Sequence, residues 1–340
     1  MKKILVTGGA GYIGSHTVAC LIEAGYEAVI VDDFSNSEKS VVENLKEITG
    51  TDLSVHEVNC VDFDALNKVF EDEKAIDGVI HFAAYKAVGE SVRNPFKYYD
   101  NNINSTLNVL ELMRRHQVKE FVFSSSCTVY GQPDSLPVSE NSPIKPAESP
   151  YGHTKQICED IILRYEHSYP ELKTAILRYF NPIGAHPSAL IGELPIGKPE
   201  NLIPFITQTA MGIREKLSVF GNDYNTPDGT AVRDYIHVMD LARAHVLSLN
   251  FLDKIKAHGE ADIINLGIGQ GFSVKEVIDC FEKVTGINVN YEFAARRAGD
   301  VEQIYSSCDR AKELLGWECE YELEDMISHA WAWQKKLSES

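Results

Sequence analysis

Three side chains suited to proton transfer, Ser126, Tyr151 and Lys155, occur close together in the sequence. A Tyr and a Lys four positions apart on a helix share one face, so the ammonium can lie near the phenol oxygen and favour the phenolate. Lowering a tyrosine pKa from ~10 to neutrality needs roughly 4 kcal/mol. Two unit charges about 4 Å apart at an effective dielectric of about 20 supply about that much, and an oxidised nicotinamide would add a second positive field. With Ser126 donating to a substrate oxygen, the set predicts redox chemistry on a hydroxyl group.

A Tyr-x-x-x-Lys spacing also occurs by chance at the start of surface helices, so this prediction depends on a cofactor site elsewhere in the chain. Gly8, Gly11 and Gly14 form a Gly-x-x-Gly-x-x-Gly turn directly after an apolar run at residues 4–6. Such glycines let backbone amides approach a pyrophosphate, and the dipole of the following helix favours its charge. The turn therefore predicts a dinucleotide site.

An acidic pair, Asp32 and Asp33, follows the glycine turn by about 20 residues, where a carboxylate accepts hydrogen bonds from the adenosine ribose. A carboxylate repels a 2′-phosphate, so the pair favours NAD over NADP. Phe82, Ala83 and Ala84, at the end of the fourth predicted strand, leave room for a cofactor to pass closely. The same string also suits ordinary packing at a strand end.

The elements that must position these residues alternate between β-rich and helical stretches, which predicts an α/β fold with a doubly wound parallel sheet of the Rossmann type. We expect strands at 3–7, 27–32, 53–58, 78–82, 120–125 and 174–179, and helices at 14–24, 63–71, 98–116 and 151–167.

The Pro- and Gly-rich stretch that opens at Asn181 marks the expected start of a second domain. We predict an NAD-binding domain over residues 1–180 and a smaller α/β substrate domain over residues 181–340. A strand-like run at 262–266 is expected to rejoin the first sheet as a seventh strand, so the two domains would be interleaved.

Composition excludes several classes of protein. The net charge of −18 over 340 residues argues against a nucleic-acid or anionic-membrane partner, because both require a positive field. The seven cysteines show no metal-ligand spacing, so we expect neither a zinc site nor a disulfide framework. No apolar stretch is long enough to span a membrane and none resembles a signal peptide, which predicts a cytoplasmic protein.

The predicted helices at 98–116 and 151–167 carry more apolar residues than one buried stripe requires. The surplus predicts a homodimer interface through these helices, or else helices deeply buried within one chain. The residues concerned are Ile103, Leu107, Val109, Leu110, Leu112, Met113, Ile157, Ile161, Ile162, Leu163 and Tyr165.

Beyond these patterns, the chain resembles the UDP-glucose 4-epimerases of the extended short-chain dehydrogenase/reductase family along essentially its whole length. The resemblance is carried by residues 6–16, 81–91, 98–102, 124–131, 177–182, 220–224, 228–230, 232–238 and 297–300. It implies reversible inversion of UDP-glucose and UDP-galactose at C4 through a 4-keto sugar, with NAD bound throughout.

The resemblance also implies roles for residues that spacing alone does not assign. Tyr151 would be the base at the sugar 4-hydroxyl, Ser126 its hydrogen-bonding companion, and Lys155 the contact to the nicotinamide ribose. The further cofactor contacts would be Tyr12, Ile13, Asn36, Ser37, Val61, Lys86, Asn101 and Phe180. The UDP-sugar pocket would contain Asn181, Asn201, Leu202, Phe220, Arg233, Arg297, Asp300 and Ile304, with the two arginines as forks for a diphosphate.

Two positions depart from that family pattern. Cys60 stands where such epimerases usually carry an Asp near the adenine, so we expect cofactor affinity to rest more on the glycine turn and Asp32. Ile304 stands where the family decides whether an N-acetyl group fits at C2 of the sugar. Because its bulk is intermediate, a UDP-N-acetylhexosamine 4-epimerase is an open alternative.

More distant alternatives are a nucleotide-sugar 4,6-dehydratase and a binding protein without catalysis. A dehydratase needs an added acid and base, usually an Asp-Glu pair beside the Ser or Thr, and here Cys127 and Thr128 follow Ser126. Binding-only relatives tend to lose the Tyr or the Lys, and both are present.

Overall fold

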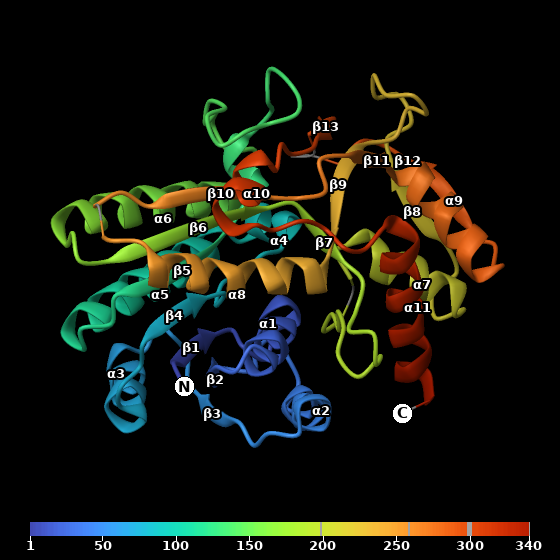
Figure 1. The fold of residues 1–340 in the computed structure, drawn as a ribbon. Coiled ribbons are helices and arrows are strands. Elements are labelled where there is room, and N and C mark those ends of the chain that lie inside the picture. Colours follow the sequence, from blue (N-terminus) through green and yellow to red (C-terminus); the bar gives the residue numbers. More distant parts are fainter. Residues whose placement is uncertain (198, 258, 298–300, 340) are drawn as a thin grey trace.

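Seven parallel strands form the main sheet of the protein, in the order β3-β2-β1-β4-β5-β6-β10 (Figure 1). The computed structural model describes residues 1–197, 199–257, 259–297 and 301–339. The strands are β1 (Lys3–Thr7), β2 (Glu27–Asp32), β3 (Ser54–Glu57), β4 (Gly78–His81), β5 (Glu120–Ser126), β6 (Lys173–Tyr179) and β10 (Asp262–Leu266). The predicted doubly wound sheet is confirmed, including its seventh strand, which pairs with β6.

Helices cover both faces of this sheet, because alternate strand residues face opposite sides. In β1, Ile4 and Val6 belong to one buried cluster and Leu5 to the other. The first cluster lies under α1 (Tyr12–Glu23), α2 (Ser40–Thr49), α8 (Val238–Lys254) and α10 (Asp309–Leu315), and the second under α3 (Phe63–Glu73), α5 (Pro95–Arg115) and α6 (Pro150–Ser168). Each face therefore has its own core.

The chain returns to the main sheet after it has entered a second, smaller unit, whose elements are given in the next paragraph. Helix α8, from the later part of the sequence, packs against α1 and against β5 and β6. Strand β10 follows α8 and completes the sheet edge beside β6. Both a helix, α8, and a strand, β10, therefore return to the main sheet, whereas the sequence suggested the strand alone. The domain boundary between residues 180 and 181 stays a prediction.

Within the described residues, the second unit contains two small sheets and three helices. Its four-stranded sheet contains β7 (Asn181–Ile183), β9 (Val232–His237), β11 (Gly271–Ser273) and β13 (Gln303–Ile304), and its two-stranded sheet contains β8 (Leu217–Phe220) and β12 (Tyr291–Ala294). The helices are α7 (Leu202–Ala210), α9 (Val274–Thr285) and α11 (Leu323–Glu339), which share one buried core. These elements lie beyond the carboxyl edge of the main sheet (Figure 1).

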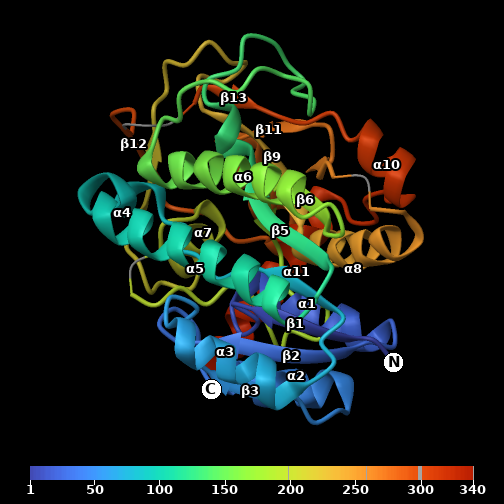
Figure 2. The same cartoon turned by 90° about the vertical axis from the view of Figure 1, so that its left-hand side faces the viewer.

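Helices α5 and α6 lie side by side on one face of the molecule, next to the short helix α4 (Val88–Arg93) (Figure 2). Most of the extra apolar side chains on α5 and α6 are buried inside this chain, among them Val109, Leu110 and Met113. Leu107 and Leu163 remain 43% and 37% exposed. Burial within the chain thus explains most of the pattern, and a smaller apolar surface remains.

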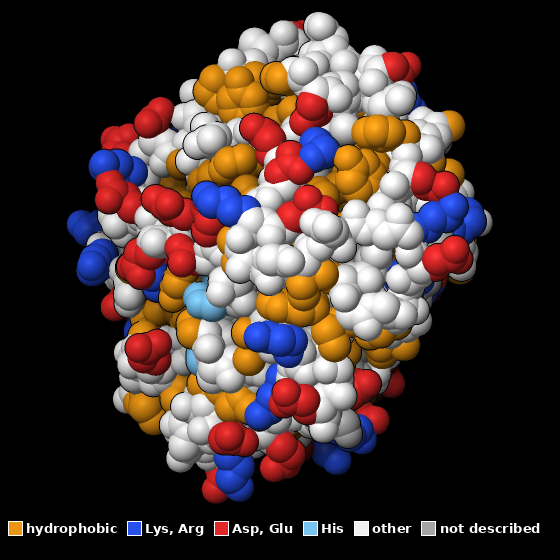
Figure 3. Space-filling model, turned by 90° about the vertical axis from the view of Figure 1, so that its right-hand side faces the viewer, with side chains coloured by type: hydrophobic (Ala, Val, Ile, Leu, Met, Phe, Trp, Pro, Cys, Tyr) orange, Lys and Arg blue, Asp and Glu red, His pale blue; other side chains and the backbone are white. Residues whose placement is uncertain are grey.

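Charged side chains of both signs alternate over the face of the second unit that Figure 3 presents. Hydrophobic side chains form separate patches between them rather than one continuous area. No helix in the described part of the chain is long and apolar enough to cross a membrane.

Candidate active site

The glycine turn between β1 and α1 packs against the chain that leaves β4. Gly8 has a φ of +69°, and a Cβ there would lie 2.9 Å from the amide nitrogen of Ala83. A Cβ on Gly14 would lie 2.1 Å from the carbonyl oxygen of Gly8. Gly11 precedes α1 and supplies no side-chain cap, which leaves the first amides of the helix for an anion. The turn therefore fits the pyrophosphate of a dinucleotide.

The predicted cofactor residues of the first four strands meet at one edge of the sheet. Because β1 pairs with β2 and β4 in parallel, their carboxyl ends lie next to one another. Three groups of predicted residues lie at this edge: Tyr12 and Ile13, which start α1; Asp32, which ends β2, with Asp33, Asn36 and Ser37 after it; and Phe82, Ala83 and Ala84 after β4.

Asp32 organises the backbone around the turn. Its Oδ2 accepts from the amide of Ala10 at 3.0 Å, and its Oδ1 accepts from the amide of Phe34 and the hydroxyl of Ser37, both at 2.9 Å. Burial raises the pKa of this carboxyl despite these donors. Asp33 accepts from the amide of Ser35. The two carboxylates thus shape the loop in which we predicted a ribose site, and the ribose contact itself stays a prediction.

Cys60 lies beside the two carboxylates, in the region that we predicted to hold the adenine. Burial and the negative charges of Asp32 and Asp33 raise the pKa of its thiol to about 12. The side chain of Asn108 donates to the carbonyl oxygens of Cys60 and Val61 at 3.0 and 2.9 Å. A neutral thiol at this position avoids a third carboxylate next to Asp32 and Asp33.

Tyr151 lies at the start of α6, directly beside Ser126 at the end of β5. The helix begins at this point because Ser149 caps it, accepting from the amide of Gly152 at 3.1 Å. The phenol of Tyr151 is buried, and the side chain of Ser126 offsets part of the rise in its pKa that burial causes. The two side chains are therefore neighbours, and their joint action on a substrate oxygen stays a prediction.

Lys155 does not lower the pKa of Tyr151 in the way that the spacing predicted. Its Nζ donates to the carbonyl oxygen of Ser124 at 2.6 Å and lies 6.0 Å from the centroid of the Tyr151 ring. Burial raises the pKa of Tyr151 to about 12 and lowers that of Lys155 to about 8. The strand holds the ammonium and both groups are desolvated, so Lys155 does not offset the effect of burial on the phenol here. The joint action of Lys155 and an oxidised nicotinamide on Tyr151 stays a prediction.

A buried pair holds α6 in place behind these residues, and sequence reasoning did not find it. The guanidinium of Arg178 on β6 donates to both carboxylate oxygens of Glu159 at 3.0 and 2.6 Å. Ser125 also donates to Glu159. A bidentate pair of this kind fixes the helix against β5 and β6, although no local motif distinguishes it from two surface charges.

Predicted cofactor and sugar residues share one apolar cluster beyond Ser126. Phe180 and Ile304, 4% and 3% exposed, pack there with Cys127, which follows Ser126 directly. In the small sheet, Ile304 is paired with Arg233 on β9. The structure therefore brings together the end of β5, the end of β6 and β13.

The two arginines predicted for the diphosphate both lie in the second unit. Nη1 of Arg233 donates to the carbonyl oxygens of Val232 and Glu302 at 2.9 and 3.4 Å. The guanidinium of Arg297 lies 5.8 Å from the centroid of the Phe220 ring. Their joint action on a diphosphate stays a prediction, and the predicted Asp300 lies outside the described residues.

The remaining predicted residues lie on either side of the connection between the two units. Nδ2 of Asn101 on α5 donates to Oδ1 of Asn102 at 3.1 Å. Asn181 opens β7, and Leu202 is the first residue of α7. Lys86 and Asn201 both donate to one oxygen of Glu193, a residue that sequence reasoning missed. The described residues contain no group of three or more His, Cys, Asp or Glu side chains that could hold a metal ion.

The sheet order, the glycine turn and the Ser-Tyr-Lys set together define a member of the extended short-chain dehydrogenase/reductase class. A family model described as GDP-mannose 4,6 dehydratase matches residues 5–330. UDP-glucose 4-epimerase of Bacillus subtilis is 51% identical over 97% of this chain and 96% of its own, and UDP-glucose 4-epimerase 2 of Arabidopsis thaliana is 49% identical over 98% and 95%. The chain belongs to the UDP-glucose 4-epimerases within this dehydratase-related family.

Solved structures agree with this assignment. UDP-glucose 4-epimerase of Bifidobacterium longum, in complex with NAD+ and UDP, superposes with a TM-score of 0.95 at 43% identity, covering 98% of each chain. The UDP-Glc/GlcNAc 4-epimerase of Campylobacter jejuni gives a TM-score of 0.84 at 39% identity, covering 99% of this chain and all of its own.

Proposed function

We propose that this protein interconverts UDP-glucose and UDP-galactose by inverting C4 of the hexose, with NAD bound through turnover. The observation that carries the proposal is the buried Ser126–Tyr151 pair, with Lys155 one helical turn further on, at the sheet edge that holds the glycine turn. Family membership supports the same reaction.

In this reaction the protein holds and moves one proton. When bound, NAD supplies hydride acceptance from C4 and hydride return, and its oxidised ring carries a positive charge. Tyr151, as the phenolate, takes the O4 proton in the first half and gives it back in the second. The positive charges of Lys155 and of the oxidised cofactor ring would favour this phenolate, and burial, which favours the neutral phenol, would help Tyr151 keep the proton while the sugar is a ketone. Ser126, next to Tyr151 at the end of β5, is proposed to donate to the same oxygen.

Inversion also requires the 4-keto sugar to turn over between the two halves. This rotation requires the protein to bind the nucleotide tightly and the hexose weakly. We propose that Arg233 and Arg297 bind the diphosphate. The apolar cluster of Phe180 and Ile304 is a wall that offers the hexose few directional contacts, so the ring can rotate about its diphosphate link.

The test is to incubate the protein with UDP-galactose without added NAD and follow UDP-glucose, with UDP-N-acetylgalactosamine in parallel. Formation of UDP-glucose, with NAD found in the denatured protein, supports the proposal. Accumulation of a 4-keto-6-deoxy sugar would indicate a dehydratase instead. No turnover despite bound dinucleotide and UDP would indicate a binding protein.

We further propose that two copies associate through α5 and α6. Exposed apolar side chains lie on these helices and on the neighbouring α4, namely Val92, Phe96, Leu107 and Leu163. Their exposure supports a dimer contact on the face shown in Figure 2. We also propose a cytoplasmic location, since all seven cysteines are free thiols and such thiols persist in a reducing compartment.

A further inference from the structure

Glu193 connects the two units with one carboxylate oxygen. It lies between β7 and α7, in a segment without a recognised motif. Its Oε1 accepts from Nζ of Lys86 at 3.3 Å and from Nδ2 of Asn201 at 2.5 Å. Lys86 follows β4 of the main sheet, whereas Asn201 directly precedes α7 of the second unit. Lys86, which we predicted to contact the cofactor, and Asn201, which we predicted to contact the substrate, therefore donate to the same carboxylate oxygen.

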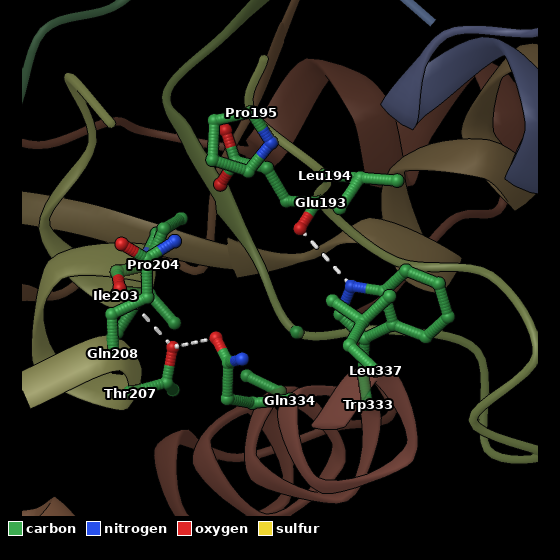
Figure 4. A pocket seen from close by; sticks show the side chains of 12 residues that line it. Glu193, Leu194, Pro195, Ile203, Pro204, Thr207, Gln208, Trp333, Gln334 and Leu337 are labelled. Atoms are coloured by element: carbon green, nitrogen blue, oxygen red, sulfur yellow. Dashed lines mark hydrogen bonds between the residues drawn. The ribbon is translucent and has the colours of Figure 1, made fainter. Parts of the chain in front are cut away.

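The main chain at Glu193 is fixed from the other side by α11. Nε1 of Trp333 donates to the carbonyl oxygen of Glu193 at 3.0 Å, as the dashed line in Figure 4 shows. A Cβ on the preceding Gly192 would lie 2.5 Å from the Trp333 ring, so only glycine allows this close approach. The carboxylate is consequently held at a defined place, and its side chain is only 12% exposed.

The same segment touches the glycine turn at its other end. The hydroxyl of Tyr12, the first residue of α1, donates to the carbonyl oxygen of Gly184 at 2.7 Å. Nζ of Lys86 lies 5.8 Å from the centroid of the Tyr12 ring. Burial, with the charge of Glu193 as a second cause, raises the pKa of Tyr12. Gly184 thus contacts the first residue of α1, and Glu193 contacts both Lys86 and the residue directly before α7.

We propose that Glu193 is a positioning residue of the epimerase, which holds Lys86 and Asn201 in place so that the two units enclose the nucleotide sugar together. This inference rests on the proposed function. A pair of two exposed groups would contribute little. Here the side chain of Lys86 is 45% exposed, but the carboxylate of Glu193 is only 12% exposed and has a second donor in Asn201. Removal of its charge leaves the ammonium of Lys86 without this partner at the boundary between the units.

The test compares Glu193→Gln with Glu200→Gln, which makes the same chemical change in the same segment. Glu200 is more exposed and pairs at 3.5 Å with Arg93 on α4. For Glu193→Gln we expect the KM for UDP-galactose to rise about tenfold, the effect of losing one hydrogen bond to a charged group, with kcat changed less. Purified protein should also retain less NAD, while the melting temperature stays near that of the wild type. Glu200→Gln should match the wild type in all four measurements.

A double variant separates positioning from a general loss of structure. If Glu193 acts through Lys86, Lys86→Met and Glu193→Gln should each raise KM. The KM of the double variant should then not exceed that of the single variant with the higher KM. Unchanged KM and NAD retention in folded Glu193→Gln would overturn the proposal, as would a KM increase that only follows a fall in melting temperature. If Glu193→Gln does not fold, Glu193→Asp, which keeps the charge but withdraws the oxygen, takes its place in the same measurements.

An inactive wild-type protein would refute the proposed epimerase function instead. In that case NAD retention and calorimetric UDP affinity of Glu193→Gln, compared with Glu200→Gln, still decide whether Glu193 positions the site. A difference confined to Glu193→Gln would support its positioning role, and equal values would exclude it.

Discussion

Nζ of Lys155 donates a 2.6 Å hydrogen bond to the carbonyl oxygen of Ser124, two residues before Ser126 on the same strand. The side chain of Ser126 in turn offsets part of the rise that burial causes in the pKa of Tyr151. The end of β5 therefore positions both polar groups of α6, one through a main-chain oxygen and the other through a hydroxyl. One strand end and one helix start thus hold the three residues near one another.

Tyr151→Phe should lower kcat by about 10²–10⁴-fold, the usual contribution of a positioned acid or base. The variant removes one hydroxyl and keeps the ring, so NAD retention and melting temperature should stay close to wild type. Turnover of UDP-galactose is the measurement. A variant with near-normal turnover would show that another group moves the O4 proton.

The sequence predicted the main sheet well because its strands are short apolar runs with clear boundaries. The glycine turn and the acidic residues at 32 and 33 follow those strands directly, so strand position alone places them at one edge. Residues that act at a distance were less predictable. Lys155 shares a helix face with Tyr151, but a main-chain oxygen of another element determines where its ammonium lies.

Glu193 shows why part of the site could not be predicted. No spacing relates it to Lys86 or Asn201, and its place depends on Trp333, far along the chain. The pair of Glu159 and Arg178 is hidden for the same reason, because only the packing of α6 on the sheet buries it. Tertiary contacts of this kind leave no local pattern in a single sequence.

Gly14→Ala should remove most of the bound NAD from the purified protein. The added methyl would lie 2.1 Å from the carbonyl oxygen of Gly8, so the turn must shift away from the geometry that admits a pyrophosphate. Absorbance of dinucleotide released on denaturation measures the loss. Gly89→Ala is the control, since its methyl would meet side-chain atoms only at 3.5 Å or more. Equal retention in both variants would contradict the assigned role of the turn.

Glu166→Gln should stabilise the protein at pH 8 but not at pH 4. Burial raises the pKa of Glu166 from 4.5 to about 7, so between these values the folded state keeps a proton that the unfolded state releases. Stability contributed by the neutral carboxyl is present below pH 4.5 and is lost as pH rises through 7. The free energy of unfolding in urea should increase by roughly 2 kcal/mol at pH 8. A gain of the same size at pH 4 would contradict this account.

Ile304 should set the preference between acetylated and plain UDP-hexoses. It is buried beside Phe180 in the proposed sugar wall, so its volume limits the space there. Ile304→Ala should raise the ratio of kcat/KM for UDP-N-acetylgalactosamine over UDP-galactose by about tenfold, and Ile304→Tyr should lower it, within the range that pocket size controls. Parallel assays of both substrates measure the ratio. A ratio that is unchanged in both variants would exclude Ile304 from the pocket.

Leu107→Asp combined with Leu163→Asp should convert a dimer into a monomer. Both side chains are partly exposed on the adjacent helices α5 and α6. In a symmetric contact each copy would contribute both new carboxylates, and all of them would be buried without a partner. Light scattering after gel filtration measures the mass. Ile213→Asp is the matched control, because Ile213 is 60% exposed and follows α7 rather than belonging to α5 or α6. If the double variant keeps the wild-type dimer mass, the contact lies on another face, and the apolar residues of α5 and α6 serve only the core of one chain.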